Sequence, residues 1–594
     1  MPSVAKPEKL PTDFSPLGIV LAMEIQRSLV MVGIAVVTYM MFLAWQEDYG
    51  KPAPVADAAV QERTVDDGIP QAVPGSEAVP AIQEAPMPDA EVVAQSQPEP
   101  EQRRDITVET DVFRLSIDRQ GGDISRVALI QYPDSVETPD QPFVLMQEDQ
   151  VRTYIAQTGL VGPNGTDSPE GRPLWLADQS HYTLSDDATE LNVDLVHRQD
   201  GNVEIIKRFT FVRGSYLVRM SHIIRNNSND TWKGALYGQL RRDASDDPSK
   251  ATAGFAPMPT YLGGAYWSEE TPFTKIDFGD MRDEPIKLTQ EGGWIAFLQH
   301  YFVAAWIPDA SLKHQYTTHY LKSSDEYLLR FLSPTATVAP GEEQVLYTEL
   351  YAGPKDQDVM ESISPGLNMT VDYGWLWFIA QPIFAVLIFL QSGYISIFGN
   401  QFDIGAGVGN WGVAIILLTL IIKSLFFKLS AASYRSMAKM RKVAPEMQRI
   451  KEQHKNDRQK QSAEMMKLYQ KEKINPLGGC LPILVQMPVF ISLYYVLLES
   501  VELRQAEFFG WIVDLSVMDP YFVLPLLMGA SMFFQMRLNP TPADPMQAQV
   551  MKWMPIIFTV FFLWFPAGLV LYWLTNNLLG IAQQWFITRS IEQD

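Results

Sequence analysis

Five apolar stretches in the last third of the chain constrain its fold more than any other feature. They cover residues 375–398, 411–428, 481–499, 521–537 and 551–588. A helix rises about 1.5 Å per residue, so about 17 to 25 apolar residues cross a hydrocarbon core of roughly 30 Å. The last stretch is too long for one crossing, and Pro566-Ala-Gly568 interrupts it, which divides it into 551–565 and 566–588. The pattern predicts a polytopic helical membrane domain.

A further apolar segment, 29–45, lies near the N-terminus. Basic residues precede it and acidic residues follow it, and basic flanks favour the cytoplasm. A cleaved signal peptide is the alternative, but the segment is longer than a usual signal core and no small-x-small site follows it directly. We therefore expect residues 1–50 to form a cytoplasmic tail and an uncleaved signal-anchor span.

The region between the anchor and the apolar stretches divides into two parts. Residues 51–104 are rich in Ala, Pro, Glu and Gln without any period, which predicts a disordered acidic linker. From 105 to 370, apolar and polar residues alternate, for example in 111–118 and 203–212, and turn signals such as Gln120-Gly-Gly-Asp123 separate the runs. Residues 105–370 are therefore predicted to form a large antiparallel β-sandwich.

The β-rich region shows no pattern typical of an active site. It holds six of the seven histidines, and none has the spacing of metal ligands. The one cysteine, Cys480, lies outside it, so a disulfide framework is excluded there. We predict no enzyme activity, no cofactor and no metal. A membrane-anchored carbohydrate-binding or carbohydrate-processing protein remains an alternative, because sandwiches can host such sites and fold alone does not decide function.

A basic block at 428–473 determines the predicted topology. It contains thirteen Lys and Arg against five acidic residues, and so basic a loop is retained in the cytoplasm. Because the β-sandwich lies on the opposite side, an odd number of crossings must separate the two. We therefore place 375–398 as a helix at the outer interface, within a region 371–410. Six spans result, five of them in a core at 411–590, with both termini cytoplasmic.

The basic block also has a helical pattern. Met, Val and Ile recur at spacings of three and four from 437 to 450, and Met465, Met466 and Tyr469 continue the stripe after a polar break at 454–457. This predicts a cytoplasmic helical hairpin over 429–475 with a Met-rich seam. Its basic face suits ribosomal RNA, anionic lipid or an acidic protein, although the charge alone could simply retain the loop. The candidate docking residues are Arg441, Lys442, Arg449, Lys451, Lys455 and Arg458.

Lys423 is a charge inside an apolar stretch, about 7–8 Å deeper than Lys428 at helical rise. Such a charge costs roughly 2.5–3.5 kcal/mol at the bilayer centre, so we expect it to face a wet cavity, with snorkelling to the headgroups as the alternative. Gln486, Gln535 and the polar run 575–577 could line that cavity. A secondary transporter with an intramembrane Lys fits equally well, but transporters usually contain internal repeats and none is found here.

Several ordered motifs between 376 and 590 carry a family resemblance. They include Ser436-Met-Ala-Lys-Met440, Asn475-Pro-Leu-Gly-Gly-Cys-Leu-Pro482, Gln486-Met-Pro488, Ser500-Val-Glu-Leu-Arg-Gln505 and Phe558-Thr-Val-Phe-Phe-Leu-Trp-Phe-Pro566. This part of the chain resembles the YidC/Oxa1/Alb3 insertase family. The order of anchor, linker and β-sandwich is similar to the family's Gram-negative form, whose β-supersandwich is periplasmic.

The resemblance implies an energy-independent insertase and chaperone in the bacterial inner membrane. It implies nascent membrane proteins as clients, membrane lipids as surroundings, and the Sec translocon with its accessory subunits and the ribosome as partners. In the family, a cation in a hydrophilic groove attracts acidic residues of the client, and apolar faces of the third and fifth spans guide its helix into lipid.

The resemblance also assigns site residues. The expected groove residues are Lys423, Thr419, Gln486, Asn576 and Trp573. The expected apolar slide residues are Phe490, Leu493, Phe558, Phe562 and Trp564.

The chain departs from the family pattern in four places. Lys423 stands where Arg is usual, and Tyr572-Trp573 where a Tyr pair is common. The region 391–410 looks longer, and no basic tail follows Ser590. Ribosome contact is therefore expected to depend on the hairpin.

Overall fold

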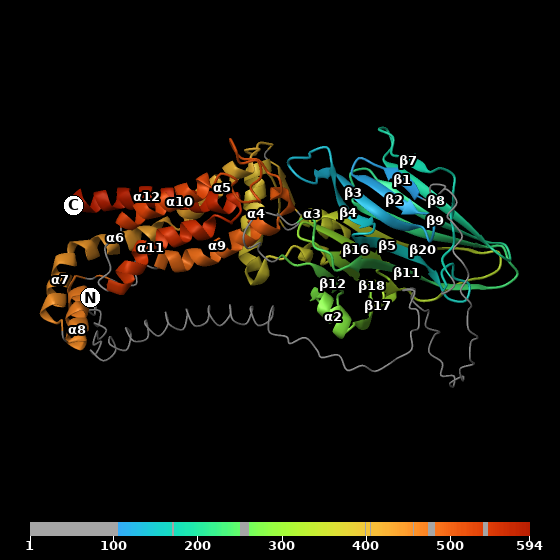
Figure 1. Ribbon diagram of the computed structural model, residues 1–594, viewed down its shortest axis with the longest axis horizontal. Coiled ribbons are helices and arrows are strands. Elements are labelled where there is room, and N and C mark those ends of the chain that lie inside the picture. Colours follow the sequence, from blue (N-terminus) through green and yellow to red (C-terminus); the bar gives the residue numbers. More distant parts are fainter. Residues whose placement is uncertain are drawn as a thin grey trace, which may run out of the picture. The chain divides into compact units, whose positions relative to one another are not determined.

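A computed structural model describes residues 105–593, apart from 169–170, 250–259, 398–399, 404, 456, 473, 475–480 and 539–544 (Figure 1). The predicted anchor and linker lie outside these described residues. Residues 439–476 belong to a structural unit different from the rest of the described chain.

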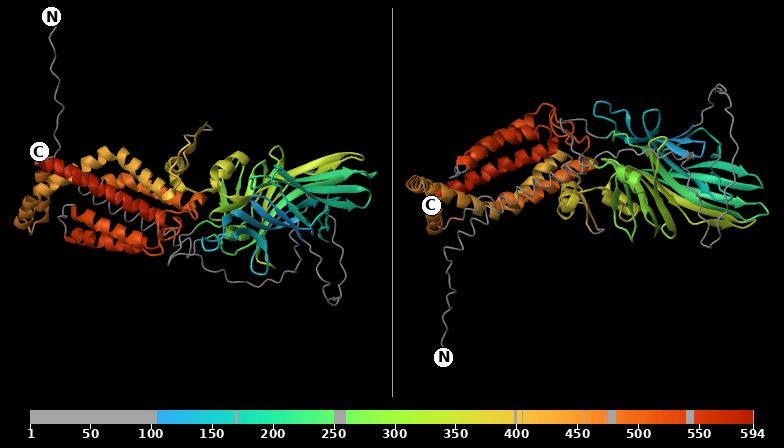
Figure 2. Two further views of the ribbon diagram at one scale, coloured as in Figure 1. Left: turned by 90° about the horizontal axis from the view of Figure 1, so that it is seen from above. Right: turned by 60° about the horizontal axis from the view of Figure 1, so that its bottom comes forward.

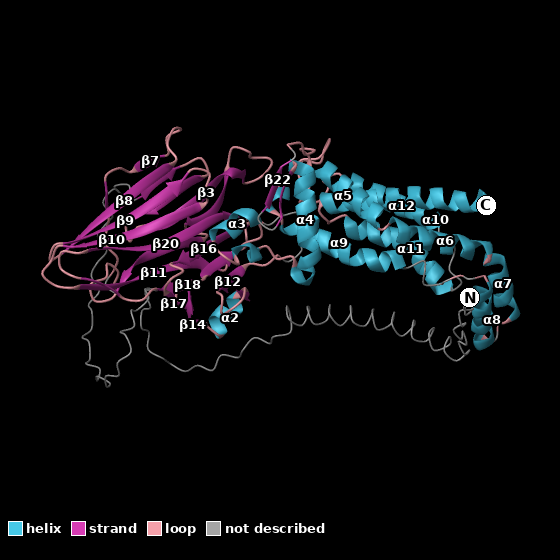
Figure 3. Cartoon of the chain, turned by 180° about the vertical axis from the view of Figure 1, so that it is seen from behind, coloured by secondary structure: helices cyan, strands magenta, loops and turns pink. Residues whose placement is uncertain are grey.

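Two large sheets make up the β-rich region, drawn in magenta in Figure 3. The first has the strand order β14-β17-β18-β11-β5-β4-β3-β2-β1-β7, with β19 paired to β11. Its strands are β1 (Asp105–Glu109), β2 (Phe113–Asp118), β3 (Asp123–Pro133), β4 (Pro142–Glu148), β5 (Thr153–Val161), β7 (His181–Thr183), β11 (Trp232–Asp243), β14 (Lys287–Glu291), β17 (Lys313–Leu321), β18 (Glu326–Leu332) and β19 (Ala336–Val338).

The second sheet has the order β13-β12-β15-β16-β20-β10-β9-β8-β6. Its strands are β6 (Leu176–Ala177), β8 (Glu190–Gln199), β9 (Val203–Val212), β10 (Leu217–Asn226), β12 (Gly263–Trp267), β13 (Thr274–Ile276), β15 (Trp294–Leu298), β16 (Phe302–Pro308) and β20 (Glu343–Pro354). Every pairing between named strands is antiparallel except β1 with β7, which is parallel.

Aromatic contacts join the two sheets face to face, as the alternating pattern predicts. Phe143 on β4 stacks on Phe302 of β16 with ring centroids 4.4 Å apart. Tyr154 on β5 meets Phe297 of β15 edge-on at 6.0 Å. Since inward side chains of both sheets are buried, this interior forms the core of a sandwich.

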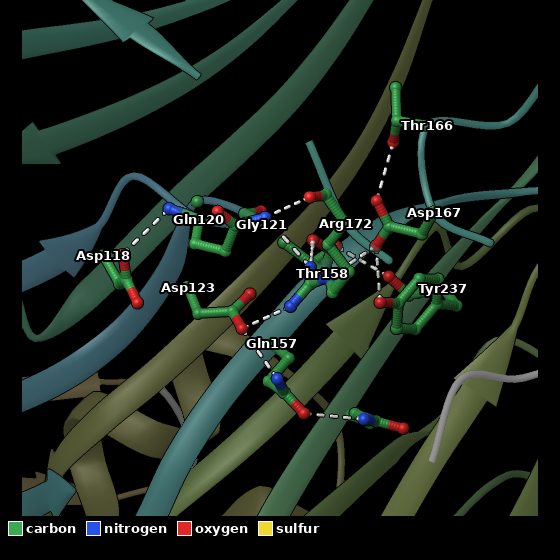
Figure 4. A network of polar contacts seen from close by, with 12 residues as sticks. Asp118, Gln120, Gly121, Asp123, Gln157, Thr158, Thr166, Asp167, Arg172 and Tyr237 are labelled. Atoms are coloured by element: carbon green, nitrogen blue, oxygen red, sulfur yellow. Dashed lines mark hydrogen bonds and ion pairs between the residues drawn. The ribbon is translucent and has the colours of Figure 1, made fainter. Parts of the chain in front are cut away.

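A buried polar network also crosses this interior (Figure 4). Arg172 pairs with Asp123 and Asp167, and the Tyr237 hydroxyl donates to Asp167 Oδ2 over 2.7 Å. Lys207, from β9 of the other sheet, donates to the Gly121, Gly122 and Thr158 carbonyls, within 2.6–3.1 Å of each. Buried charges persist where they are paired and hydrogen-bonded, and this network meets that condition.

After β20, the rest of the described chain is mainly helical (Figures 1 and 2). They are α3 (Gln357–Ile363), η1 (Leu367–Thr370), η2 (Gly374–Leu376), α4 (Trp377–Ser392), α5 (Trp411–Leu425), α6 (Phe427–Lys442), α7 (Ala444–Gln453), α8 (Arg458–Lys471), α9 (Leu481–Glu499), η4 (Val501–Leu503), α10 (Val523–Leu538), α11 (Pro545–Phe562) and α12 (Ala567–Gln593). The short α2 (Phe278–Asp283) lies earlier, and a hairpin of β21 (Tyr394–Ile397) and β22 (Asn400–Asp403) follows α4.

Three helix boundaries differ from or refine the predictions. The helix expected over 375–398 ends at Ser392, because Gly393 adopts φ 81° and a strand begins at Tyr394. The last apolar stretch divides just before Pro566, as predicted. The stretch 411–428 is not one straight helix, since α5 and α6 meet at a bend of 67°.

Five of the six predicted spans fall in the part of the chain that the structure describes, and length and apolarity there support only one or two crossings. Gly374–Ser392 alone is long and apolar enough to cross a membrane, and the bent pair α5–α6 would count as a second crossing. Three shorter apolar helices cover Val485–Glu499, Val523–Leu538 and Gln549–Phe562.

Candidate substrate groove

Lys423 lies in the last turn of α5 and is 8% exposed. Its side chain lines a small pocket beside the bend between α5 and α6. The pocket is lined by Ile422, Lys423, Phe426, Leu429, Ser430 and Gln486. Within the described residues, no carboxylate pairs with Lys423 and no hydrogen bond uses its ammonium. The prediction that Lys423 faces a cavity is consistent with this pocket.

Next to the bend between α5 and α6, a serine hydroxyl bonds back to its own helix. No proline lies at the bend, but the Ser424 hydroxyl donates to the Leu420 carbonyl over 2.8 Å. Thr419 does the same to Ile415 over 2.7 Å. Hydroxyls that bond back to a carbonyl one turn earlier tend to bend helices. Thr419, expected in the groove, is fully buried and lies outside the pocket lining.

Gln486 joins α9 to α12 at the edge of the pocket. Its Nε2 donates to the Asn576 Oδ1 and lies 3.5 Å from the Tyr572 hydroxyl oxygen. The structure therefore brings together three of the five expected groove residues, namely Lys423, Gln486 and Asn576.

Trp573 lies instead with the expected slide residues. Its ring is 4.6 Å from that of Phe490, 5.3 Å from Phe562 and 6.2 Å from Phe558, measured between centroids. Its indole nitrogen is buried without a hydrogen-bond partner among the described residues. Trp573 thus belongs to an apolar cluster between α9, α11 and α12, which we call the aromatic cluster: Phe490, Phe558, Phe562 and Trp573.

The remaining slide residues are arranged differently. Leu493 is fully buried and Phe562 is 2% exposed, so neither offers a free surface in this conformation. Trp564, in the turn between α11 and α12, is 37% exposed. Larger exposed apolar surfaces lie on α10 and α11, including Phe534 and Phe561.

Sequence reasoning missed the contribution of α6 to the pocket. Residues from 429 onward were assigned to the hairpin, yet Leu429 and Ser430 line the pocket. Ser430 and Ser433 are buried, and Tyr434 is half-buried. Ser430, Ser433 and Tyr434 are spaced by three and four positions, so they form a polar stripe on one face of α6. This stripe is the sequence signal that could have identified them as pocket residues.

In the unit 439–476, α7 and α8 lie on either side of the polar segment 454–457. Met447 is buried, and the Tyr469 hydroxyl lies 3.9 Å from its sulfur. The expected first helix is broken at Val443, and α7 begins at Ala444 with Pro445 in its first turn. Four of the six expected docking residues are exposed, namely Arg441, Lys442, Arg449 and Lys455. Lys451 is half-buried, and the Arg458 side chain is not among those that the structure describes.

Comparison with known proteins gives consistent matches. The protein-family model of the YidC periplasmic domain matches residues 105–386, and the family model of the 60Kd inner membrane protein matches residues 403–594. The membrane protein insertase YidC of Alcanivorax borkumensis is 65% identical over 580 residues, 96% of this chain and 100% of the relative. The membrane protein insertase YidC of Azotobacter vinelandii is 51% identical over 579 residues, which cover 96% of this chain and 99% of the relative.

One solved structure, an active YidC insertase with its first transmembrane domain resolved, matches 81% of this chain and 92% of its own. The two are 18% identical, with a TM-score of 0.35.

Proposed function

This chain belongs to the YidC family of membrane protein insertases, and on that premise we propose that it inserts inner-membrane proteins through the pocket at Lys423. The observation that carries the proposal is a buried ammonium that lines a pocket and has no acidic partner among the described residues. A cation held at low dielectric attracts a carboxylate more strongly than it would in water.

The proposed sequence of events follows from the two clusters. An acidic residue in the client's translocated segment enters the pocket and is held by Lys423, beside the amides of Gln486 and Asn576. The apolar helix of the client then passes along the outside of α9 and α11, close to the aromatic cluster. Its release into lipid is favoured by burial of apolar surface.

The proposed topology has six spans and cytoplasmic termini, with the β-sandwich in the periplasm. It is supported by the match of 105–386 to a periplasmic domain and by the basic block. It requires α4 to lie at the outer interface, although its length would allow a crossing. Labelling of single cysteines, in a background with Cys480→Ser, tests this: cysteines at both ends of α4 should react from the periplasm.

The proposed partners bind the cytoplasmic face of the protein. The exposed basic residues of α6 and α7 suit the ribosome or anionic lipid. The Sec translocon is the proposed partner for larger clients. The family is one of insertases, and no catalytic residue is proposed.

Insertion into proteoliposomes that contain only this protein tests the proposal. The client has a single span and a short acidic translocated tail, and protection of the tail from protease is scored. Wild type and Lys423→Arg should insert the client, whereas Lys423→Ala should not. If Lys423→Ala inserts as well as wild type, the pocket is not the site, and if folded wild type inserts nothing, the chain is not a stand-alone insertase.

A further inference from the structure

α12 lacks a side chain at the point where three polar groups from other helices approach it. A Cβ on Gly580 would lie 3.7 Å from Lys423 Nζ, 3.6 Å from the Tyr434 hydroxyl oxygen and 3.1 Å from Gln535 Nε2. These groups come from α5, α6 and α10. Three polar ends thus meet at one place on a fourth helix.

All three groups can donate hydrogen bonds. An ammonium has three donors, a phenol one, and an amide two. Within the described residues, no hydrogen bond or ion pair uses the Lys423 ammonium, the Tyr434 hydroxyl or the Gln535 amide. A convergent set of donors that includes a cation is complementary to a carboxylate, whose two oxygens accept several bonds.

The glycine is otherwise unfavourable at this position. Gly580 lies well inside α12, where alanine would form the helix better. The other glycines of α10 and α12 have a packing reason: a Cβ on Gly529 would collide with the Thr559 side chain, and one on Gly568 would meet the Leu515 carbonyl at 3.2 Å. Gly580 instead faces the ends of flexible polar side chains, which could give way to a methyl group.

We infer that Gly580 determines which client tails the site at Lys423 accepts, because its missing side chain lets the polar ends of Lys423, Tyr434 and Gln535 converge, so that a client carboxylate held by Lys423 can also accept from the other two. The inference rests on the proposed function and names the ligand-contacting groups of the same site. Tyr434, Gln535 and Gly580 are then specificity-determining residues beside the cation.

The test uses two clients that differ only in the tail, which carries either one Asp or one Asn. They are inserted by proteoliposomes of wild type, Gly580→Leu, Gly580→Ala, Gln535→Met and Ala582→Leu. Ala582 is exposed on the same helix two residues away, so Ala582→Leu places the same leucine side chain outside the site. Melting temperatures are measured alongside.

Wild type and Ala582→Leu should insert the Asp client about tenfold better than the Asn client, the difference expected for one charge-assisted contact. Gly580→Leu should reduce insertion of the Asp client to the level of the Asn client, and Gln535→Met, which keeps Lys423, should lower the preference for Asp without abolishing it. Gly580→Ala should melt no lower than wild type and still show a reduced preference for Asp, which keeps the test valid if Gly580→Leu misfolds.

Three results would overturn the inference. If wild type prefers the Asp client and both Gly580→Ala and Gln535→Met keep that preference in full, Gly580 does not shape the site, while the proposed insertase function stands. If Gly580→Leu lowers insertion of both clients equally together with the melting temperature, its role is packing. A wild type that inserts neither client would instead remove the proposed function, and the inference with it.

Discussion

At the residue scale, the chain holds buried charges in two contrasting ways. Arg172 has two acidic partners and Lys207 has three carbonyls, whereas Lys423 has neither among the described residues. Lys423 was visible in the sequence because a lone charge stands out in an apolar stretch. The neighbours of its ammonium, Tyr434 and Gly580, were not, because they depend on how α6 and α12 approach α5.

Arg172 should contribute strongly to the stability of the sandwich. Arg172→Met leaves Asp123 and Asp167 buried without their cation, and breaking a buried pair costs about 3–5 kcal/mol. Arg225→Met is the control, because Arg225 pairs with Glu343 while 44% exposed, and such pairs contribute about 0–1 kcal/mol. Denaturant unfolding of the full chain, followed by tryptophan fluorescence, measures both. Equal losses would contradict the account.

Glu502, just beyond α9, should make stability depend on pH. Burial, with Asp356 and Asp358 nearby, raises the pKa of Glu502 to about 8, and its Oε2 is buried without a hydrogen-bond partner among the described residues. The unfolded carboxyl titrates near about 4.3. The folded state therefore retains a proton that the unfolded state loses, and stability from this group falls as the pH rises from about 4 to 8.

Glu502→Gln imitates the neutral acid at every pH. The melting temperature of Glu502→Gln should therefore equal that of wild type at about pH 4 and exceed it by the largest margin at about pH 8. Thermal unfolding of both proteins across this range measures the difference. A difference that does not change with pH would show that Glu502 titrates normally.

At the element scale, the helices were easier to predict than their bends. The apolar runs gave their approximate positions, and Pro566 marked the break between α11 and α12. The 67° bend after α5 has no proline to announce it, so the sequence predicted a straight span. The close approach of α10 to α11 at Gly529 is likewise a tertiary effect, in line with small residues at contacts between membrane helices.

Gly529→Ala should separate α10 from α11. The new methyl group would collide with the Thr559 side chain, and overpacking of this kind costs about 1–3 kcal/mol. Thr559→Ala in the same chain should restore much of the loss. Gly279→Ala, in α2 with open space around it, is the control and should be neutral or slightly stabilising. If thermal unfolding shows no rescue by Thr559→Ala, the two helices do not meet as described.

At the scale of the whole molecule, composition and period identified the sandwich and the helical part, but not how they connect. Arg504, after α9, donates to the Pro133 and Asp134 carbonyls over 2.8 and 2.9 Å and lies over the rings of Phe143 and Phe302. Contacts between residues about 370 positions apart leave no periodic signal in one sequence. The same holds for the strand order of the two sheets.

If Lys423 attracts the client through charge, exchanging the charges of the two partners should exchange the client preference. Clients with one Asp or one Lys in an otherwise identical tail are offered to proteoliposomes of wild type and of Lys423→Glu. Wild type should insert the Asp client better, and Lys423→Glu should invert the preference in favour of the Lys client. If both proteins keep the same order of preference, Lys423 does not act through its charge and the account of the pocket is wrong.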